Sequence, residues 1–318
     1  MQEVHNTHLR QTKREHFLTQ LKRHLPFYLM LILPLIQVIV FNYLPIYGIQ
    51  IAFKDFKMKR GIAGSAWVGL KHFEKMFNDP TFYRVLQNTL RLSFLNLLFI
   101  FPLTVIFALL MNEVRNDKFK RITQTITYLP HFLSWVVVGG FVYQLLSPSH
   151  GIVNAILLQL GILDKPIYFM IQSNMFDPIY LIASAWKELG WGIVIYLAAI
   201  AGIDPSLYES AVIDGANHFQ EIWHITLPCI RTTIATLLVL SVGDIMSAGF
   251  DQIFNLHTNM NTAKQVVEIL DTYVYETGVK NGKFAYSAVV GITKSVINVV
   301  LLVIANVSVG KLTGESPL

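Results

Sequence analysis

Charge is scarce in this sequence. Only 14% of the 318 residues are charged, whereas a soluble globular domain carries roughly 25%. Apolar residues make up 53% and the mean hydropathy is +0.48, so polar groups are too few to cover a water-soluble surface of this size. The abundant Leu, Ile, Val and Phe also exclude intrinsic disorder. The composition therefore predicts an integral membrane protein.

Cysteine and catalytic motifs are also nearly absent. The one cysteine, Cys229, excludes an internal disulfide and a cysteine-only metal cluster. There is no Walker-type phosphate loop, no Gly-x-Ser-x-Gly elbow and no His-Glu-x-x-His helix. His218 and His224 are six residues apart, which does not place them on one helix face as i, i+4 ligands. The sequence therefore predicts no metal site, no bound cofactor and no enzymatic activity on this chain.

The chain is basic, with a formal net charge of +5, but its Lys and Arg residues are spread over many short segments. No basic stripe or nucleic-acid signature stands out. We expect contact with anionic lipid headgroups rather than with nucleic acid.

Long apolar runs are plentiful, and a spanning helix needs about 20 mostly apolar residues. The sequence predicts an all-α membrane protein with six transmembrane helices. They are expected over Phe27–Ile46, Thr89–Met111, Ile122–Leu146, Pro178–Ile200, Thr232–Phe254 and Ala285–Val309. Between the first two, the sequence Asn78-Asp79-Pro80 predicts a turn that interrupts a helical pattern.

The two ends of the chain are polar. Residues 1–25 lack the short apolar core and small-residue cleavage site of a signal peptide. We expect an uncleaved amphipathic tail over 1–25, a transmembrane domain over 26–312 and a short tail over 313–318. With both ends cytoplasmic, each side of the membrane carries eleven Lys and Arg residues, so the positive-inside rule does not orient the protein.

The most informative segment is 204–228, between the fourth and fifth predicted spans. Asp204 is a good N-cap and Pro205 a good first helical residue. Asp214-Gly215 signals a turn, after which a second short helix is expected to end at Pro228. The segment predicts a helical hairpin outside the bilayer, suited to docking a soluble partner.

This segment resembles the EAA loop of ATP-binding-cassette importer permeases. It reads Glu209-Ser210-Ala211, then Asp214-Gly215-Ala216, then Ile225-Thr226-Leu227-Pro228 at the family's spacing. Ser210 in place of alanine is the one departure. A DNA-binding helix-turn-helix would need basic side chains in its second helix, where this chain has Glu221, His218 and His224.

Several other segments resemble those of permeases that import oligosaccharides derived from polysaccharides. They are residues 42–45, 53–56, 67–73, 128–135 and 271–275, and the resemblance covers residues 26–312. It implies a type I importer of the bacterial cytoplasmic membrane. The implied partners are a second permease, two ATPase subunits that hold ATP and Mg²⁺, and an extracytoplasmic solute-binding protein. Since the loop must face the ATPases, both termini are expected in the cytoplasm.

The resemblance implies that Glu209 and Asp214 are candidates for salt bridges to an ATPase, the alternative being a solvated helix face. The residues implied to couple this chain to the ATPase are Glu209, Ala211, Asp214, Gly215, Ala216, Ile225, Leu227 and Pro228.

Polar and aromatic side chains inside the spans are candidates for a sugar path, because ionisable residues there usually face a cavity. They are Trp186, Lys187, Glu188, Trp191, Asp244, Asp251, Lys294 and Asn298. Asp244 and Asp251 are expected to share a helix face, as are Lys294 and Asn298. The alternative is that Lys187–Glu188 and Asp244–Lys294 are structural ion pairs between helices.

Two other functions fit the sequence less well. A secondary transporter driven by an ion gradient, with Asp244, Asp251 or Glu188 as its ion site, leaves 204–228 unexplained and should show inverted repeats. A membrane-embedded enzyme lacks a catalytic constellation. The sequence names neither the saccharide nor its length; the basic charge hints at acidic, uronic or alginate-like sugars, and lipid contact explains it as well.

Overall fold

The computed structural model describes residues 20, 23–247, 249–260 and 264–313, which are mostly helical. They form two compact units, 1–69 and 70–318, which are described separately. The prediction of an all-α membrane fold is confirmed. The predicted tails at 1–25 and 313–318 lie almost entirely outside the described residues.

The first unit contains one apolar helical stretch, Arg23–Phe53, that is long enough to span a membrane and has no residue of its apolar window buried in the chain. The α-helix passes into a π-helix, η1 (Ile39–Tyr43), and a 3₁₀-helix, η2 (Leu44–Phe53). A helix that is apolar on all sides is typical of a membrane span.

A small hairpin follows in the same unit. Its strands β1 (Lys54–Asp55) and β2 (Ala66–Trp67) are antiparallel, with a 3₁₀ turn η3 (Met58–Arg60) between them. The rings of Phe53 and Trp67 stack with their centroids 5.5 Å apart.

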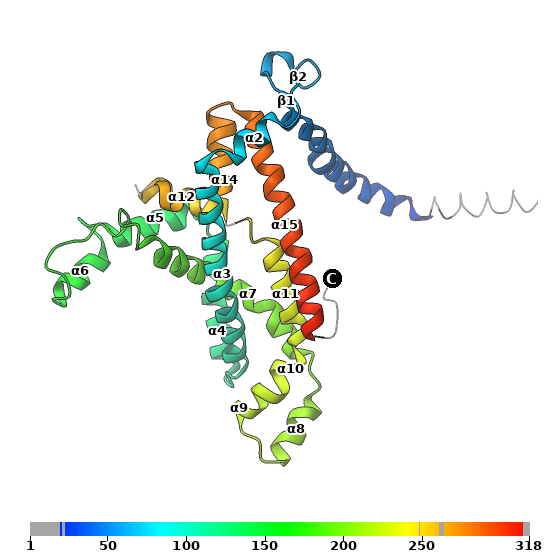
Figure 1. Cartoon of the computed structure of the whole chain (residues 1–318). Helices are drawn as coiled ribbons and strands as arrows, with labels where there is room; N and C mark the ends of the chain where they lie inside the picture. The colour runs from blue at the N-terminus through cyan, green and yellow to red at the C-terminus, as the bar shows by residue number, and fades with distance from the viewer. Residues whose placement is uncertain (1–19, 21–22, 248, 261–263, 314–318) are drawn as a thin grey trace, which may run out of the picture. The chain divides into compact units, whose positions relative to one another are not determined.

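The second unit begins with α2 (Lys71–Phe77) and the long helix α3 (Pro80–Asn112) (Figure 1). The turn predicted at Asn78-Asp79-Pro80 is present, and Asp79 caps α3 by accepting a hydrogen bond from the Thr81 amide at 2.9 Å. α3 packs along α7 (Phe176–Ala201), the predicted fourth span. Their shared core includes Ala108, Ile193 and Tyr196.

The third predicted span is not one helix, and the single-helix prediction for Ile122–Leu146 is wrong. α4 (Asp117–Tyr128) passes through the 3₁₀ turn η4 (Leu129–Phe132) before α5 (Trp135–Leu146) begins at an angle of 101°. Pro130 in η4 has no N–H to donate, and the Ser134 hydroxyl caps the new helix by accepting from the Val137 amide. A short helix, α6 (Ile152–Gln159), follows α5.

The fifth predicted span is also interrupted. α11 (Arg231–Gly243) ends just before Asp244, and α12 (Phe250–Met260) begins after Gly249, whose φ is +77°. Thr232–Phe254 is therefore not a single helix. Asp244 lies outside both helices, so the expectation that it shares a helix face with Asp251 is wrong.

The last part of the chain contains a helix that is long enough to span a membrane. After α13 (Lys264–Val267), α14 (Leu270–Val274) and the π-helix η6 (Tyr275–Lys280), the helix α15 (Phe284–Thr313) packs on α11. Within the described residues four helices are long and apolar enough to cross a membrane, or up to six if each of two bent helix pairs is counted as one span.

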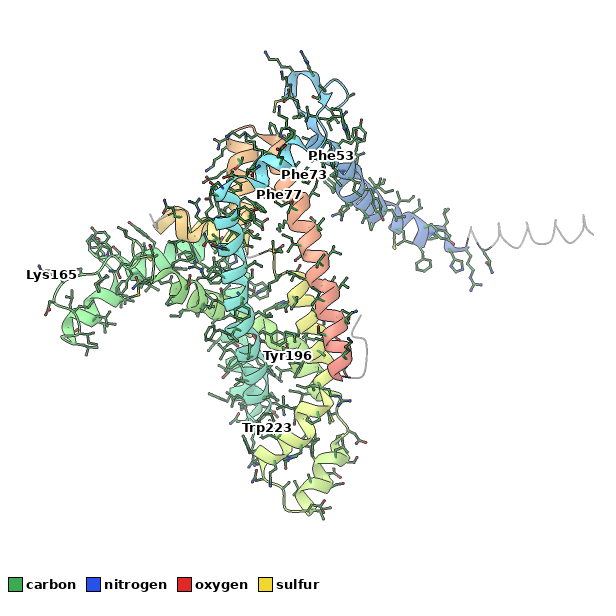
Figure 2. All side chains as sticks on the ribbon, viewed as in Figure 1. Phe53, Phe73, Phe77, Lys165, Tyr196 and Trp223 are labelled. Atoms are coloured by element: carbon green, nitrogen blue, oxygen red, sulfur yellow. The ribbon has the colours of Figure 1, made fainter. Side chains whose placement is uncertain are left out.

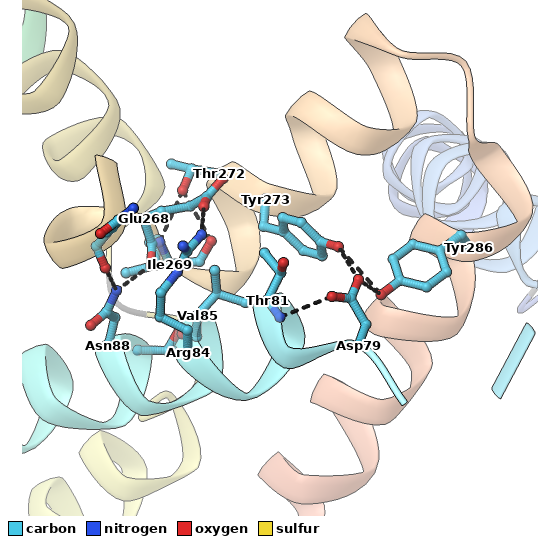
Figure 3. A network of polar contacts seen from close by, with 12 residues as sticks. Asp79, Thr81, Arg84, Val85, Asn88, Glu268, Ile269, Thr272, Tyr273 and Tyr286 are labelled. Atoms are coloured by element: carbon cyan, nitrogen blue, oxygen red, sulfur yellow. Dashed lines mark hydrogen bonds and ion pairs between the residues drawn. The ribbon is translucent and has the colours of Figure 1, made fainter. Parts of the chain in front are cut away.

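A polar network fixes α14 and the residues before it against one end of α3 (Figure 3). The Asp79 carboxylate accepts hydrogen bonds from the hydroxyls of Tyr286 at 2.8 Å and Tyr273 at 3.1 Å. Arg84 forms an ion pair with Glu268 at 2.9 Å. Partial burial raises the pKa of Asp79, but the hydrogen bonds from Tyr286, Thr81 and Tyr273 outweigh it, and the pKa lies below its ordinary value.

Candidate functional site

The segment predicted to dock a partner is a helical hairpin. Its first helix is α8 (Pro205–Ile213), and its second arm comprises α9 (His218–Glu221), the π-helix η5 (Ile222–Thr226) and α10 (Leu227–Cys229). Asp204 caps α8 as expected, accepting from the Ser206 amide at 3.0 Å. That hydrogen bond lowers the pKa of the exposed Asp204 carboxyl.

The turn between the two arms has a defined hydrogen-bond pattern. The Ala216 amide donates to the Ala211 carbonyl at 2.9 Å and the Gly215 amide to the Val212 carbonyl at 3.1 Å, which is a Schellman motif. Gly215 has φ +81°, and a Cβ there would meet nothing within 4 Å of this chain. Glycine is favoured here because L side chains rarely adopt that conformation, and the open space above it is available to a partner.

The second arm starts at a capping box that the sequence analysis missed. The Asn217 side chain accepts from the Gln220 amide, and the Gln220 side chain accepts from the Asn217 amide; the spacing Asn-x-x-Gln would have signalled it. The arm ends at Cys229, one residue past the predicted end at Pro228. A π-helical turn before the proline widens the helix there, and the break falls at Ile230, with a bend of 61° before α11.

The two arms of the hairpin are held together by side-chain contacts, and the hairpin exposes apolar side chains. The Tyr208 hydroxyl lies 2.9 Å from the Thr226 hydroxyl and ties the arms together, while Ile222 and Leu227 pack against the core of α3 and α7. Large apolar side chains are exposed next to the turn, at Val212 and Ile213, and on the second arm, at Phe219 and Trp223, with Ile213 at 85%. Figure 2 labels Trp223 on the second arm.

A recess of about 280 Å³ lies between the two arms. Five of the predicted coupling residues line it: Ala211, Asp214, Gly215, Ala216 and Ile225. Glu209 and Pro228 are exposed and do not line it, and Leu227 packs against the core. The structure thus brings most of the predicted set together on one surface.

A second feature is a cavity of about 480 Å³ between α3, α7, α11 and the interrupted segment that follows α11. Its polar and aromatic lining includes Asn96, Thr104, Tyr180, Glu188, Trp191, Tyr196, Ser241, Asp244 and Gln252. Among the described residues no Lys or Arg lines it. Three of the eight predicted path residues, Glu188, Trp191 and Asp244, therefore reach this cavity.

Beside the cavity lies a cluster built around His131, a residue that the site prediction missed. Its ring stacks on Trp191 at 4.7 Å, and its Nδ1 lies 2.7 Å from Glu188. The Lys187 ammonium, in a residue only 5% exposed, donates to the His131 carbonyl at 2.8 Å and to Glu188 at 3.0 Å. The Lys187–Glu188 ion pair is present, but it lies within α7 rather than between helices, and Lys187 is enclosed rather than facing the cavity.

The other predicted path residues lie elsewhere. Trp186 lines a separate, largely apolar groove between α5, α6 and α7, and Asp251 is exposed on α12. Lys294 pairs with Asp271 of α14, so the Asp244–Lys294 pair is wrong. Asn298, one turn from Lys294 on α15, accepts from the Met246 amide at 3.3 Å. Within the described ranges, no group of three His, Cys, Asp or Glu side chains could hold a metal ion.

Comparison with known proteins shows which family has a similar sequence and fold. Residues 100–313 match the family model for the inner-membrane component of binding-protein-dependent transport systems. The chain is 43% identical to the polygalacturonan/rhamnogalacturonan transport system permease protein YteP of Bacillus subtilis (strain 168), over 92% of this chain and 90% of that protein. It is 42% identical to protein LplB of the same strain, over 91% and 90%.

The same fold occurs in a crystal structure of a bacterial alginate ABC transporter in complex with an alginate pentasaccharide-bound periplasmic protein. The TM-score is 0.82 at 39% identity, covering 94% of this chain and 98% of the matched chain. On these sequence and fold matches, this chain belongs to the family of inner-membrane permease components of binding-protein-dependent transport systems.

Proposed function

We propose that this chain is the membrane-spanning permease subunit of an ATP-driven sugar importer. It forms the translocation path together with a second, related permease, and an extracytoplasmic solute-binding protein delivers the oligosaccharide. The family assignment supports an importer of this kind over a secondary transporter driven by an ion gradient. The transmembrane domain spans residues 26–312 in this proposal, with the tails at 1–25 and 313–318 at the lipid surface or in solvent.

The observation that carries the proposal is the hairpin at 204–229. A Schellman turn, two N-caps and the Tyr208–Thr226 contact make it rigid, and its exposed apolar tip lies beside an open recess. Exposed apolar patches of this kind mark protein interfaces. We assign the recess to one of two ATPase subunits, which hold the ATP and Mg²⁺. The hairpin and both termini then face the cytoplasm of a bacterial cell.

The cavity between α3 and α7 is the proposed sugar path on this subunit. Sugar rings stack on aromatic faces, and their hydroxyls exchange hydrogen bonds with amides, hydroxyls and carboxylates. Trp191, Asn96 and Gln252 supply such groups on three different helices. Trp191 is held in place by the His131 ring stacked on it.

We propose that the cargo is an oligosaccharide from an acidic polysaccharide. The name of a relative with 43% identity refers to polygalacturonan and rhamnogalacturonan, and the matched solved structure is an alginate transporter. Because Glu188 and Asp244 are the charged groups among the described residues of this cavity wall, the cations that receive sugar carboxylates are expected on the second permease and the binding protein.

The test is the ATPase activity of the complete reconstituted transporter with its binding protein and a panel of neutral and acidic oligosaccharides. The key variant is Gly215→Asp, which places a side chain in the space assigned to the ATPase. Its matched control is Gly161→Asp, because Gly161 also has a positive φ (+67°) and an open Cβ position but lies outside the hairpin.

Saccharide-stimulated ATPase activity in the wild type, retained by Gly161→Asp and lost by Gly215→Asp, supports the proposal. Equal stimulation of the ATPase activity by saccharide in both variants would show that the hairpin is not part of the docking surface. Uptake that depends on an ion gradient and not on ATP would contradict the importer and favour the secondary transporter.

A further inference from the structure

A polar contact joins the hairpin to the end of α3, apart from the apolar packing at its base. His218 is the first residue of α9 and lies inside the capping box formed by Asn217 and Gln220, which fixes its backbone position. Its Nε2 lies 2.7 Å from Nη2 of Arg115, which is in the short connection between α3 and α4. Two segments 103 residues apart therefore meet through one imidazole ring.

The chemistry of the two side chains fixes the proton on that ring. A guanidinium has only donors, so Nε2 of His218 must accept. The neutral ring then carries its proton on Nδ1, which lies 3.1 Å from a carboxylate oxygen of Glu221 and 3.8 Å from one of Glu113. Glu221 belongs to α9, and Glu113 caps the end of α3. The ring thus lies against Glu221 of α9 on one side and against Glu113 and Arg115 of the α3–α4 connection on the other.

Any displacement passed to this junction acts on a long uninterrupted helix. α3 has 33 residues, which corresponds to about 50 Å at 1.5 Å per residue. Its middle part carries Asn96 and Thr104 into the proposed sugar path. Its far end is held by Asp79, Arg84 and Asn88 in the network of Figure 3. A shift of the hairpin can therefore reach the cavity wall along one element.

We propose that His218 is a positioning residue that transmits movement of the hairpin to α3 through Arg115 and Glu113. This inference rests on the proposed function, because the movement comes from ATPase subunits docked on the hairpin. Ile222 and Leu227 anchor the base of the hairpin in the core, and the His218 contact sets the angle of its outer part. Loss of the contact lowers the amount of transport that each hydrolysed ATP supports.

The experiment measures ATP-dependent oligosaccharide uptake and ATP hydrolysis in the same proteoliposomes that contain the complete transporter. The reported quantity is the number of saccharides imported per ATP hydrolysed. Four variants are compared: His218→Phe, His218→Gln, Arg115→Gln and the double variant Arg115→Gln with His218→Phe. Lys118→Gln is the control, because Lys118 is an exposed cation just beyond this connection and outside the contact.

His218→Phe and Arg115→Gln should each lower the ratio about two- to fivefold, the range expected for an exposed polar contact. His218→Gln should keep it near wild type, because its Oε1 can accept from Arg115. The double variant should be no worse than either single variant.

A normal ratio in His218→Phe, a defect in His218→Gln equal to that of the phenylalanine variant, or additive effects in the double variant would overturn the inference. Failure of the proposed function is seen separately, as a wild-type complex that imports no saccharide when ATP is supplied.

Discussion

Gly190 of α7 lies in backbone contact with Thr127 of α4. A Cβ at Gly190 would lie 2.0 Å from the Thr127 carbonyl oxygen and 2.4 Å from its carbonyl carbon. Small residues allow such close helix crossings in membrane proteins. The crossing brings the end of α4, and the turn that carries His131, against the part of α7 that carries Lys187 and Glu188.

Replacement of Gly190 by alanine should separate α4 from α7. Since the obstructing atoms belong to the backbone, we expect a destabilisation of about 1–3 kcal/mol, typical of overpacking. The measurement is the thermal unfolding temperature of the detergent-solubilised protein. Gly140→Ala is the control: Gly140 lies in the helix α5, and a Cβ there meets nothing within 4 Å. Equal unfolding temperatures for the two variants would contradict the close crossing.

Lys187→Met should destabilise the protein by about 1–3 kcal/mol, because the His131 carbonyl and the Glu188 carboxylate each lose a donor. Adding Glu188→Gln to this variant should cost less than Glu188→Gln costs in the wild type, since the two residues interact directly. Thermal unfolding of the wild type, the two single variants and the double variant measures this coupling. Strictly additive losses would show that the pair contributes nothing.

The Asp79 carboxylate should stabilise the contact between α3, α14 and α15 in a pH-dependent way. Its pKa is lowered in the folded protein, so its contribution is complete above the unfolded pKa of about 3.9 and is lost as the pH falls through the lower folded value. The unfolding-temperature difference between wild type and Asp79→Asn should thus be constant from about pH 7 to pH 5 and shrink below about pH 3.9. An unfolding-temperature difference that grows on acidification would contradict this prediction.

Asp244→Asn should favour acidic over neutral saccharides. Two unit charges 4 Å apart in water interact with about 1 kcal/mol, or roughly fivefold in binding, and Asp244 faces the cavity. We expect the ratio of acidic to neutral oligosaccharide uptake to rise up to about fivefold. Asp251→Asn is the control, since Asp251 is exposed on α12 outside the cavity lining. The same change in both variants would exclude a specific role for Asp244 in this preference.

The hairpin could be predicted in detail because its signals are local. Asp204, Pro205 and Gly215 each act on their own backbone, and their effects do not depend on distant residues. The second arm ends at Cys229, one residue past Pro228, and a π-helical turn precedes the proline.

The interrupted spans could not be predicted from hydropathy. Pro130 and Gly243–Gly249 lie inside runs that are apolar enough to span, and hydropathy does not report helix direction. The assumed Asp244–Lys294 pair failed for a related reason. Asp244 lies after the end of α11, and Lys294 meets Asp271 where α14 folds beside α15. His131 was missed as a site residue because only the bend at η4 brings it to Glu188.

The central claim, that the hairpin at 204–229 docks an ATPase, is tested most directly by site-specific cross-linking in the assembled transporter. The chain has a single, exposed cysteine, Cys229, so Cys229→Ser gives a background without thiols. Ile213→Cys then places one thiol at the exposed tip, and Lys165→Cys places one on an exposed connection outside the hairpin. We predict a cross-link to the ATPase from position 213 and none from position 165. A cross-link from 165 with none from 213 would contradict the account.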